Sequence, residues 1–144
     1  MRDAVARALR RAIASGALPA PDDTEALETA IAGLEVEIPA NRDHGDYASN
    51  IAMKGSKLLK RAPAQIAAAI AAELAAEAGA RMHGGNAALG PIAHAEVAGP
   101  GFLNLRLRAG LLAEMLDAIV ASPLAWGHLA VVADTSPYRV NIEF

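Results

Sequence analysis

The segment from Phe102 to Leu107 carries three side chains whose chemistry suits the binding of RNA. Side chains of an extended strand alternate between two faces, so Phe102, Asn104 and Arg106 would share one face and the leucines between them the other. An aromatic ring can stack on an unpaired base, an amide can hydrogen-bond to its edge, and a guanidinium can bind its phosphate. The pattern therefore predicts a leucine core face and an exposed RNA-binding face. The alternative is that Phe102 packs beneath a loop and the two polar residues are ordinary surface residues.

A second group with possible chemistry is His44 beside Asp46, in the loop that begins at Asn41. An aspartate can orient an imidazole and raise its pKa, so the pair could belong to a small hydrolase, whose turnover would be lost on His44→Ala. The sequence supplies no nucleophile, second base or oxyanion site at a useful spacing, which favours a structural role. In that role Gly45 would permit a tight turn, and Asp46 or Ser49 would cap a helix.

Three cations, Lys54, Lys57 and Arg61, recur at the spacing of one helical face. Such a stripe is either a solvated surface or a patch that attracts phosphates, and the second interpretation requires that it lie beside the Phe102 strand.

Other ligand sites are not predicted. The histidines are too scattered for metal ligation, and Gly99-Pro100-Gly101 lacks the following helix and the Gly-Lys-Ser/Thr ending of a phosphate loop. The histidines are His44, His83, His94 and His128.

The composition indicates a helix-rich protein with a thin core. Of 144 residues, 53% are hydrophobic but only 3% are aromatic, and alanine supplies much of the apolar mass. The net charge of −3 means that any polyanion would be met by a local patch rather than by a global field. The absence of cysteine excludes disulfides and thiolate zinc sites, and fits a reducing compartment. No segment approaches the ~18 apolar residues of a membrane span and the N-terminus does not resemble a secretory signal, so we expect a cytoplasmic location and no membrane partner.

Hydrophobic periodicity and breakers predict the elements that would position these residues. Helices are expected over 2–15, 24–33, 47–61, 63–79 and 111–120, strands over 34–38, 92–97 and 102–107, and strand-like segments over 131–132 and 140–144. The glycine-rich residues 98–101 would join two antiparallel strands. We therefore expect an α+β fold, with a small, mostly antiparallel sheet packed against about four helices, rather than a doubly wound sheet.

Two motifs match one family when they are taken together. The first is His44-Gly45-Asp46-Tyr47-Ala48-Ser49-Asn50, followed by a helix that begins Ile51-Ala52-Met53-Lys54. The second, about fifty residues later, is Val97-Ala98-Gly99-Pro100-Gly101-Phe102-Leu103-Asn104-Leu105-Arg106-Leu107. Their order and separation resemble the N-terminal additional domain of arginyl-tRNA synthetases, over nearly the whole chain.

The resemblance implies that the domain contacts the D-loop of the tRNA specific for arginine. Phe102 would correspond to the aromatic and Asn104 to the amide that recognise a D-loop nucleotide, with phosphate attraction from the cations Arg106, Lys54, Lys57 and Arg61. The two glycine-containing motifs would then be structural signatures, through His44, Gly45, Asp46, Tyr47, Asn50, Gly99, Pro100 and Gly101.

The same resemblance predicts the domain organisation. Residues 1–122 would form the tRNA-binding domain, and residues 123–144 a linker and the start of a class I catalytic domain, whose first strand residues 140–144 resemble. The parent enzyme would use ATP with magnesium to attach arginine to its tRNA. The histidine pair of the adenylate-binding signature, the later lysine-containing loop and the anticodon-binding domain are missing here. We therefore expect this fragment to be a monomer without cofactor or activity, joined to the rest of the synthetase chain. The alternative is a freestanding protein- or RNA-interaction module.

Overall fold

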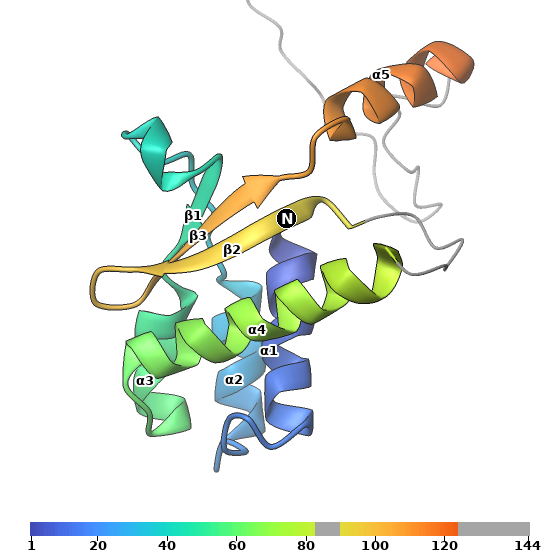
Figure 1. The fold of residues 1–144 in the computed structure, drawn as a ribbon. Helices are drawn as coiled ribbons and strands as arrows, with labels where there is room; N and C mark the ends of the chain where they lie inside the picture. Colours follow the sequence, from blue (N-terminus) through green and yellow to red (C-terminus); the bar gives the residue numbers. More distant parts are fainter. Residues whose placement is uncertain (83–89, 124–144) are drawn as a thin grey trace, which may run out of the picture. The chain divides into compact units, whose positions relative to one another are not determined.

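The computed structural model describes residues 1–82 and 90–123, and it has the α+β class expected from the sequence (Figure 1). Residues 1–111 form one compact unit, and α5 belongs to a second. The strand-like segments expected over 131–132 and 140–144 lie outside the described residues. The elements are α1 (Arg2–Ala14), α2 (Thr24–Ala32), a short 3₁₀ helix η1 (Arg42–His44), β1 (Tyr47–Ser49), α3 (Ile51–Leu59), α4 (Pro63–Met82), β2 (Ile92–Ala98), β3 (Phe102–Leu107) and α5 (Leu111–Ala121).

The sheet has three antiparallel strands in the order β1-β3-β2, so β3 is central. The predicted pair of strands about residues 98–101 is confirmed. Gly101 has φ +139°, and a Cβ at this position would lie 2.5 Å from Pro63 Cβ at the start of α4. The turn therefore needs glycine both for its backbone conformation and for its close approach to α4.

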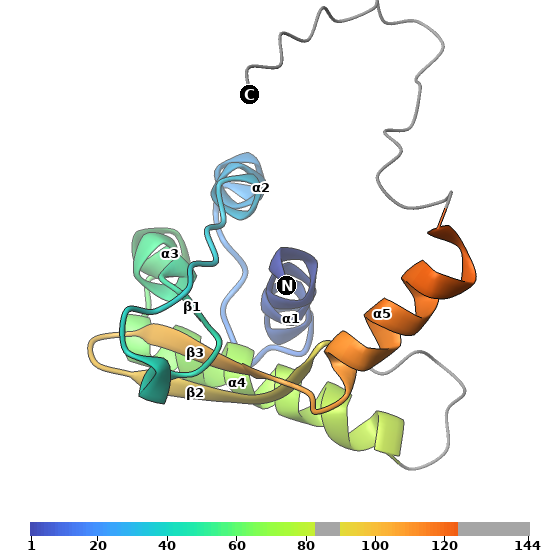
Figure 2. The same ribbon diagram turned by 90° about the horizontal axis from the view of Figure 1, so that it is seen from above.

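The core lies between the sheet and the helices α1, α3 and α4. α4 runs along one face of the sheet and also packs against α1 and α3 (Figure 2). The predicted leucine face of β3 is confirmed, because Leu103 and Leu105 are fully buried. Ile66 and Ile70 of α4 and Leu9 of α1 are buried in the same core.

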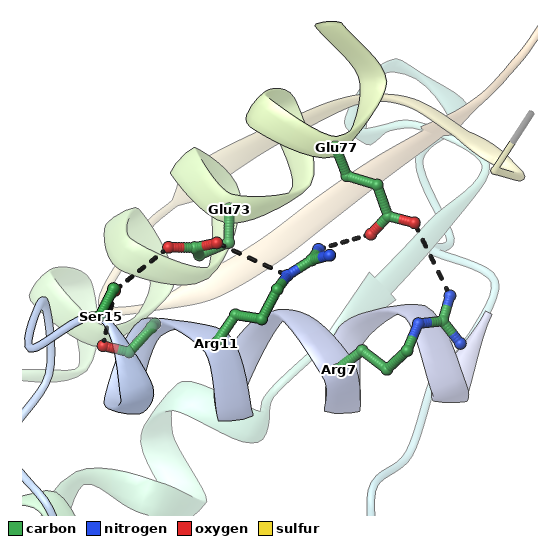
Figure 3. Close-up of polar contacts among 6 residues, drawn as sticks. Arg7, Arg11, Ser15, Glu73 and Glu77 are labelled. Carbon is green, nitrogen blue, oxygen red and sulfur yellow. Dashed lines mark hydrogen bonds and ion pairs between the residues drawn. The ribbon is translucent and has the colours of Figure 1, made fainter. Parts of the chain in front are cut away.

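Polar side chains also join α1 to α4, where the sequence predicted only arginines on the side of the helix away from the core (Figure 3). Arg11 donates a hydrogen bond of 2.5 Å to Glu77 and lies 3.6 Å from Glu73, and Arg7 lies 3.9 Å from Glu77. Ser15 Oγ donates to Glu73 at 3.3 Å. The side chain of Glu77 is 10% exposed, so this contact is part of the packing between the two helices.

Two expected elements, the strand over 34–38 and the helix over 47–61, differ in the structure. Residues 34–38 form no strand but a single bridge between Glu37 and Ala48. The helix expected from residue 47 begins at Ile51, because Tyr47 to Ser49 pair with β3 instead. That helix ends at Leu59, since Lys60 adopts the left-handed conformation with φ 49°, so Arg61 is not on it.

Candidate nucleic-acid interface

A groove of about 630 Å³ lies over the face of the sheet that carries Phe102 and Asn104. Its residues come from the segment that bridges to β1, from η1, from the β2–β3 turn and from β3. The lining residues are Glu37, Ile38, Pro39, Ala40, His44, Ala48, Ala98, Gly99, Pro100, Phe102 and Asn104.

Phe102 and Asn104 both line this groove, but they differ in exposure. Phe102 is 41% exposed, as its place on the polar face of β3 predicts. Asn104 was expected to be exposed, yet it is only 5% exposed. It sits in the middle of the central strand, with Ala48 and Glu96 as its neighbours across the sheet.

The amide of Asn104 lies at the groove wall, and no hydrogen bond to it is found within residues 1–82 and 90–123. Asn104 as a whole is only 5% exposed, but its amide atoms are not among the buried unpaired atoms of the described residues, which are Arg11 Nε and Asn50 Oδ1. The amide therefore reaches the space of the groove, where it can donate and accept hydrogen bonds.

Arg106 does not stand free on the same face. One of its Nη atoms donates a hydrogen bond of 2.6 Å to the backbone carbonyl of Asp43, so the guanidinium holds η1 against β3. Its side chain is still exposed, so the attraction of phosphates by Arg106 stays a prediction. Strand alternation predicts which face a side chain shares but not what crosses that face.

The His44-Gly45-Asp46 motif fastens its loop to β3, a structural role other than the helix cap expected of Asp46. The backbone N–H of Asp46 donates to Leu105 O at 2.9 Å, and Asp46 Oδ2 accepts from the N–H of Leu107 at 2.7 Å. Gly45 has φ +104°, and a Cβ at this position would lie 2.7 Å from Leu105 O. The strand thus approaches the loop more closely than any side chain at residue 45 would allow.

Of the two candidates for the helix cap, only Ser49 forms a hydrogen bond at the start of α3. Asp46 does not cap α3, because its carboxylate is bonded to β3. Ser49 Oγ accepts from the N–H of Ile51 at 3.4 Å and donates to Glu35 O at 2.8 Å, so it ties the start of α3 to the segment before β1. Asn50 is the N-cap residue but makes no side-chain cap hydrogen bond.

The structure does not assemble the hydrolase pair. His44 lines the groove as an exposed side chain, whereas the carboxylate of Asp46 points to the backbone of β3.

The cationic stripe is only partly assembled. Lys54 forms an ion pair of 2.6 Å with Glu35, and this hydrogen bond holds the pKa of the Glu35 carboxyl below its usual value. Lys57 is exposed on α3, and Arg61 is exposed beyond the end of the helix. None of the three lines the groove.

Sequence reasoning missed the residues of the groove that lie far from β3 in the sequence. Glu37 and Ile38 were assigned to a half-buried strand, yet Ile38 is 66% exposed at the groove. An apolar residue directly before Pro39, in a segment too short to pair fully, is the signal that could have pointed to them.

The described part of the chain contains no group of three or more His, Cys, Asp or Glu side chains placed to hold a metal ion. Among its helices, none combines the length and hydropathy needed to cross a membrane.

Comparison with known proteins agrees with this architecture. Residues 1–107 match the family described as "Arginyl tRNA synthetase N terminal domain". An arginine–tRNA ligase of Frankia alni is 33% identical over 144 residues, and one of Symbiobacterium thermophilum is 40% identical over 127 residues. These alignments cover 100% and 88% of this chain but only 22% and 19% of the two relatives.

This α+β domain is therefore an N-terminal domain of the aminoacyl-tRNA synthetase class. The chain belongs to the arginyl-tRNA synthetase N-terminal domain family. Membership of this family does not favour the alternative interpretation of the chain as a freestanding interaction module.

Proposed function

We propose that this chain is the tRNA-binding N-terminal domain of an arginine–tRNA ligase, and that its groove recognises one unpaired base of the D-loop. The observation that carries the proposal is that the partly exposed ring of Phe102 and the amide of Asn104, which has no partner among the described residues, line one groove. An aromatic face beside a hydrogen-bonding amide is what recognition of an unstacked RNA base requires.

In this proposal each residue has a distinct part. Phe102 stacks on the base and Asn104 bonds to its edge. Lys57 and Arg61, together with Lys54 where its pair with Glu35 opens, attract the neighbouring phosphates. Arg106 acts mainly by holding η1 in place, since its guanidinium already binds Asp43 O.

The chemistry of the ligase lies elsewhere in this proposal. Gly99-Pro100-Gly101 connects two strands and packs against Pro63, so it cannot act as a phosphate loop at a helix N-terminus. In this proposal, ATP with magnesium binds to the parts of the ligase that activate arginine. We assign arginine activation in the cytoplasm to parts of the ligase beyond this chain, and to this domain the affinity for tRNA.

The test is aminoacylation by the ligase that carries this chain as its N-terminal domain. Stacking of a base on an aromatic side chain is worth ~1–3 kcal/mol, so Phe102→Ala should raise KM for tRNA by about tenfold. We expect Asn104→Ala to have a similar effect, while KM for arginine and kcat at saturating tRNA stay unchanged.

Val97→Ala is the matched control, because Val97 is also a partly exposed apolar residue of the sheet but does not line the groove. If Phe102→Ala and Asn104→Ala together leave KM for tRNA at the value of this control, the groove does not recognise tRNA.

A further inference from the structure

We propose that Glu37 determines which base the groove accepts, by taking a hydrogen bond from an exocyclic amino group. The groove would then prefer a base that carries such a group over uracil, which has none. This inference rests on the proposed function and adds to it a residue and a class of base.

The first support is the register of the sheet. Glu37 bridges to Ala48, Ala48 pairs with Asn104, and Asn104 pairs with Glu96. Directly opposed residues place their side chains on the same face, about 5 Å apart. The side chains of Glu37, Ala48 and Asn104 thus form one row across the sheet. The side chains of Glu37 and Asn104 are roughly 10 Å apart, with only the methyl group of Ala48 between them. This spacing leaves room for a flat ring with one edge toward each side chain.

The second support is that both polar groups are available. Glu37 is exposed and lines the groove, and no ion pair or side-chain hydrogen bond engages it in the part of the chain that the structure describes. Its neighbour Glu35, by contrast, is bound by Lys54. The amide of Asn104, at the groove wall, likewise has no hydrogen-bond partner among the described residues. A ligand between them would therefore break no existing contact.

The third support is the charge of the groove. No lysine or arginine is found among the described residues that line it, so a phosphate placed beside Glu37 would be repelled without compensation. A base carries no such charge.

The chemistry of the carboxylate then selects the base. Ionised Glu37 can only accept hydrogen bonds, whereas the amide of Asn104 can both donate and accept. An exocyclic amino group donates to the carboxylate from the edge of the base. Uracil offers only N3–H, and the carbonyl oxygens on both sides of it repel the carboxylate. Glu37 thus discriminates by forming a weaker hydrogen bond with uracil than with an amino-bearing base.

The experiment compares tRNA transcripts in the ligase that carries this chain. Each unpaired D-loop nucleotide is replaced in turn by an abasic one, since any remaining base could still stack on Phe102. The base in the groove is the one whose removal abolishes the effect of Phe102→Ala. The value of kcat/KM is then measured for transcripts with an amino-bearing base or uracil at that position. We expect the wild type to discriminate by about tenfold and Glu37→Gln by less than about threefold, since a glutamine can also donate to a carbonyl.

Glu96→Gln is the matched control. It removes the same charge from the same row on the other side of Asn104, but Glu96 does not line the groove. Discrimination should stay at the wild-type value in this variant, although both substitutions reduce repulsion of tRNA in general.

The two proposals fail in different ways. If Glu37→Gln keeps the wild-type discrimination while Phe102→Ala still raises KM for tRNA, the inference about Glu37 is overturned and the proposed function stands. If no D-loop replacement interacts with Phe102→Ala, both are overturned. Because Glu37 is exposed, an unchanged circular dichroism spectrum and melting temperature should verify that Glu37→Gln folds.

Discussion

At the scale of single residues, the alternation of β3 was predictable and the surroundings of its side chains were not. The sequence places Phe102, Asn104 and Arg106 on one face because the strand period is local. Burial of Asn104 depends on β3 being the central strand, and the engagement of Arg106 depends on η1, which lies some sixty residues earlier. The six residues of the strand alone do not predict such long-range contacts.

The turn glycines allow a prediction at this scale. Gly99 and Gly101 both have positive φ, but a Cβ at Gly99 meets open space whereas one at Gly101 meets Pro63. Gly99→Ala should cost only the ~1–2 kcal/mol of a left-handed alanine. Gly101→Ala adds a clash with the start of α4 and should be more destabilising by at least about 1 kcal/mol. Urea unfolding of the two variants measures the difference, and equal losses would contradict the clash.

At the scale of elements, local patterns predicted the helices better than the sheet. α1, α4, β2 and β3 follow their periodicity closely, because each has enough residues to show it. β1 has three residues, and its neighbour at Glu37 pairs through one bridge. Segments this short take their conformation from the strand they meet, which explains why Tyr47 was assigned to a helix.

The contact between α1 and α4 carries the prediction at this scale. Glu77 is mostly buried and binds two arginines of α1, whereas Glu28 pairs with Arg10 in the open. Glu77→Ala removes the carboxylate that Arg7 and Arg11 share and leaves Arg11 only the longer contact with Glu73, so it should lower the free energy of unfolding by about 1–2 kcal/mol. Glu28→Ala removes a solvated pair and should change stability little. Thermal or urea denaturation distinguishes them, and a smaller loss for Glu77→Ala than for Glu28→Ala would contradict this account.

At the scale of the whole molecule, charge is distributed as many exposed pairs rather than as one field. Three carboxyls, Asp22, Glu28 and Glu35, have pKa values below their ordinary values of 3.8, 4.5 and 4.5, each because a cation donates a hydrogen bond to it. The cations are Lys60, Arg10 and Lys54, and the first two have raised pKa values in return. The composition determines the net charge but does not predict which charged residues form these pairs, because their members lie up to 38 positions apart in the sequence.

The pairs predict how stability depends on pH. A carboxyl whose pKa is lowered by folding stabilises the folded state above its unfolded pKa, and this contribution is lost as the pH falls through the folded value. Stability should therefore be constant near neutral pH and decline below about pH 4.5, with a weaker decline at high salt because all three pairs are exposed. Urea midpoints between pH 3 and pH 7 measure this, compared with a variant carrying Asp22→Asn, Glu28→Gln and Glu35→Gln. An equally steep acid decline in that variant would contradict the assignment.

The ties between η1 and β3 have a consequence for the thermodynamics of binding. Asp46 and Gly45 hold the loop against Leu105 and Leu107, and Arg106 holds Asp43, so opposite sides of the groove are fixed to each other before any ligand arrives. A binding surface assembled in advance loses little conformational entropy on association, whereas a loose loop would have to be ordered at the expense of affinity. In the proposed function, Gly45 and Asp46 thus act on recognition without contacting the base, because they keep the unbound groove in the conformation that binds it.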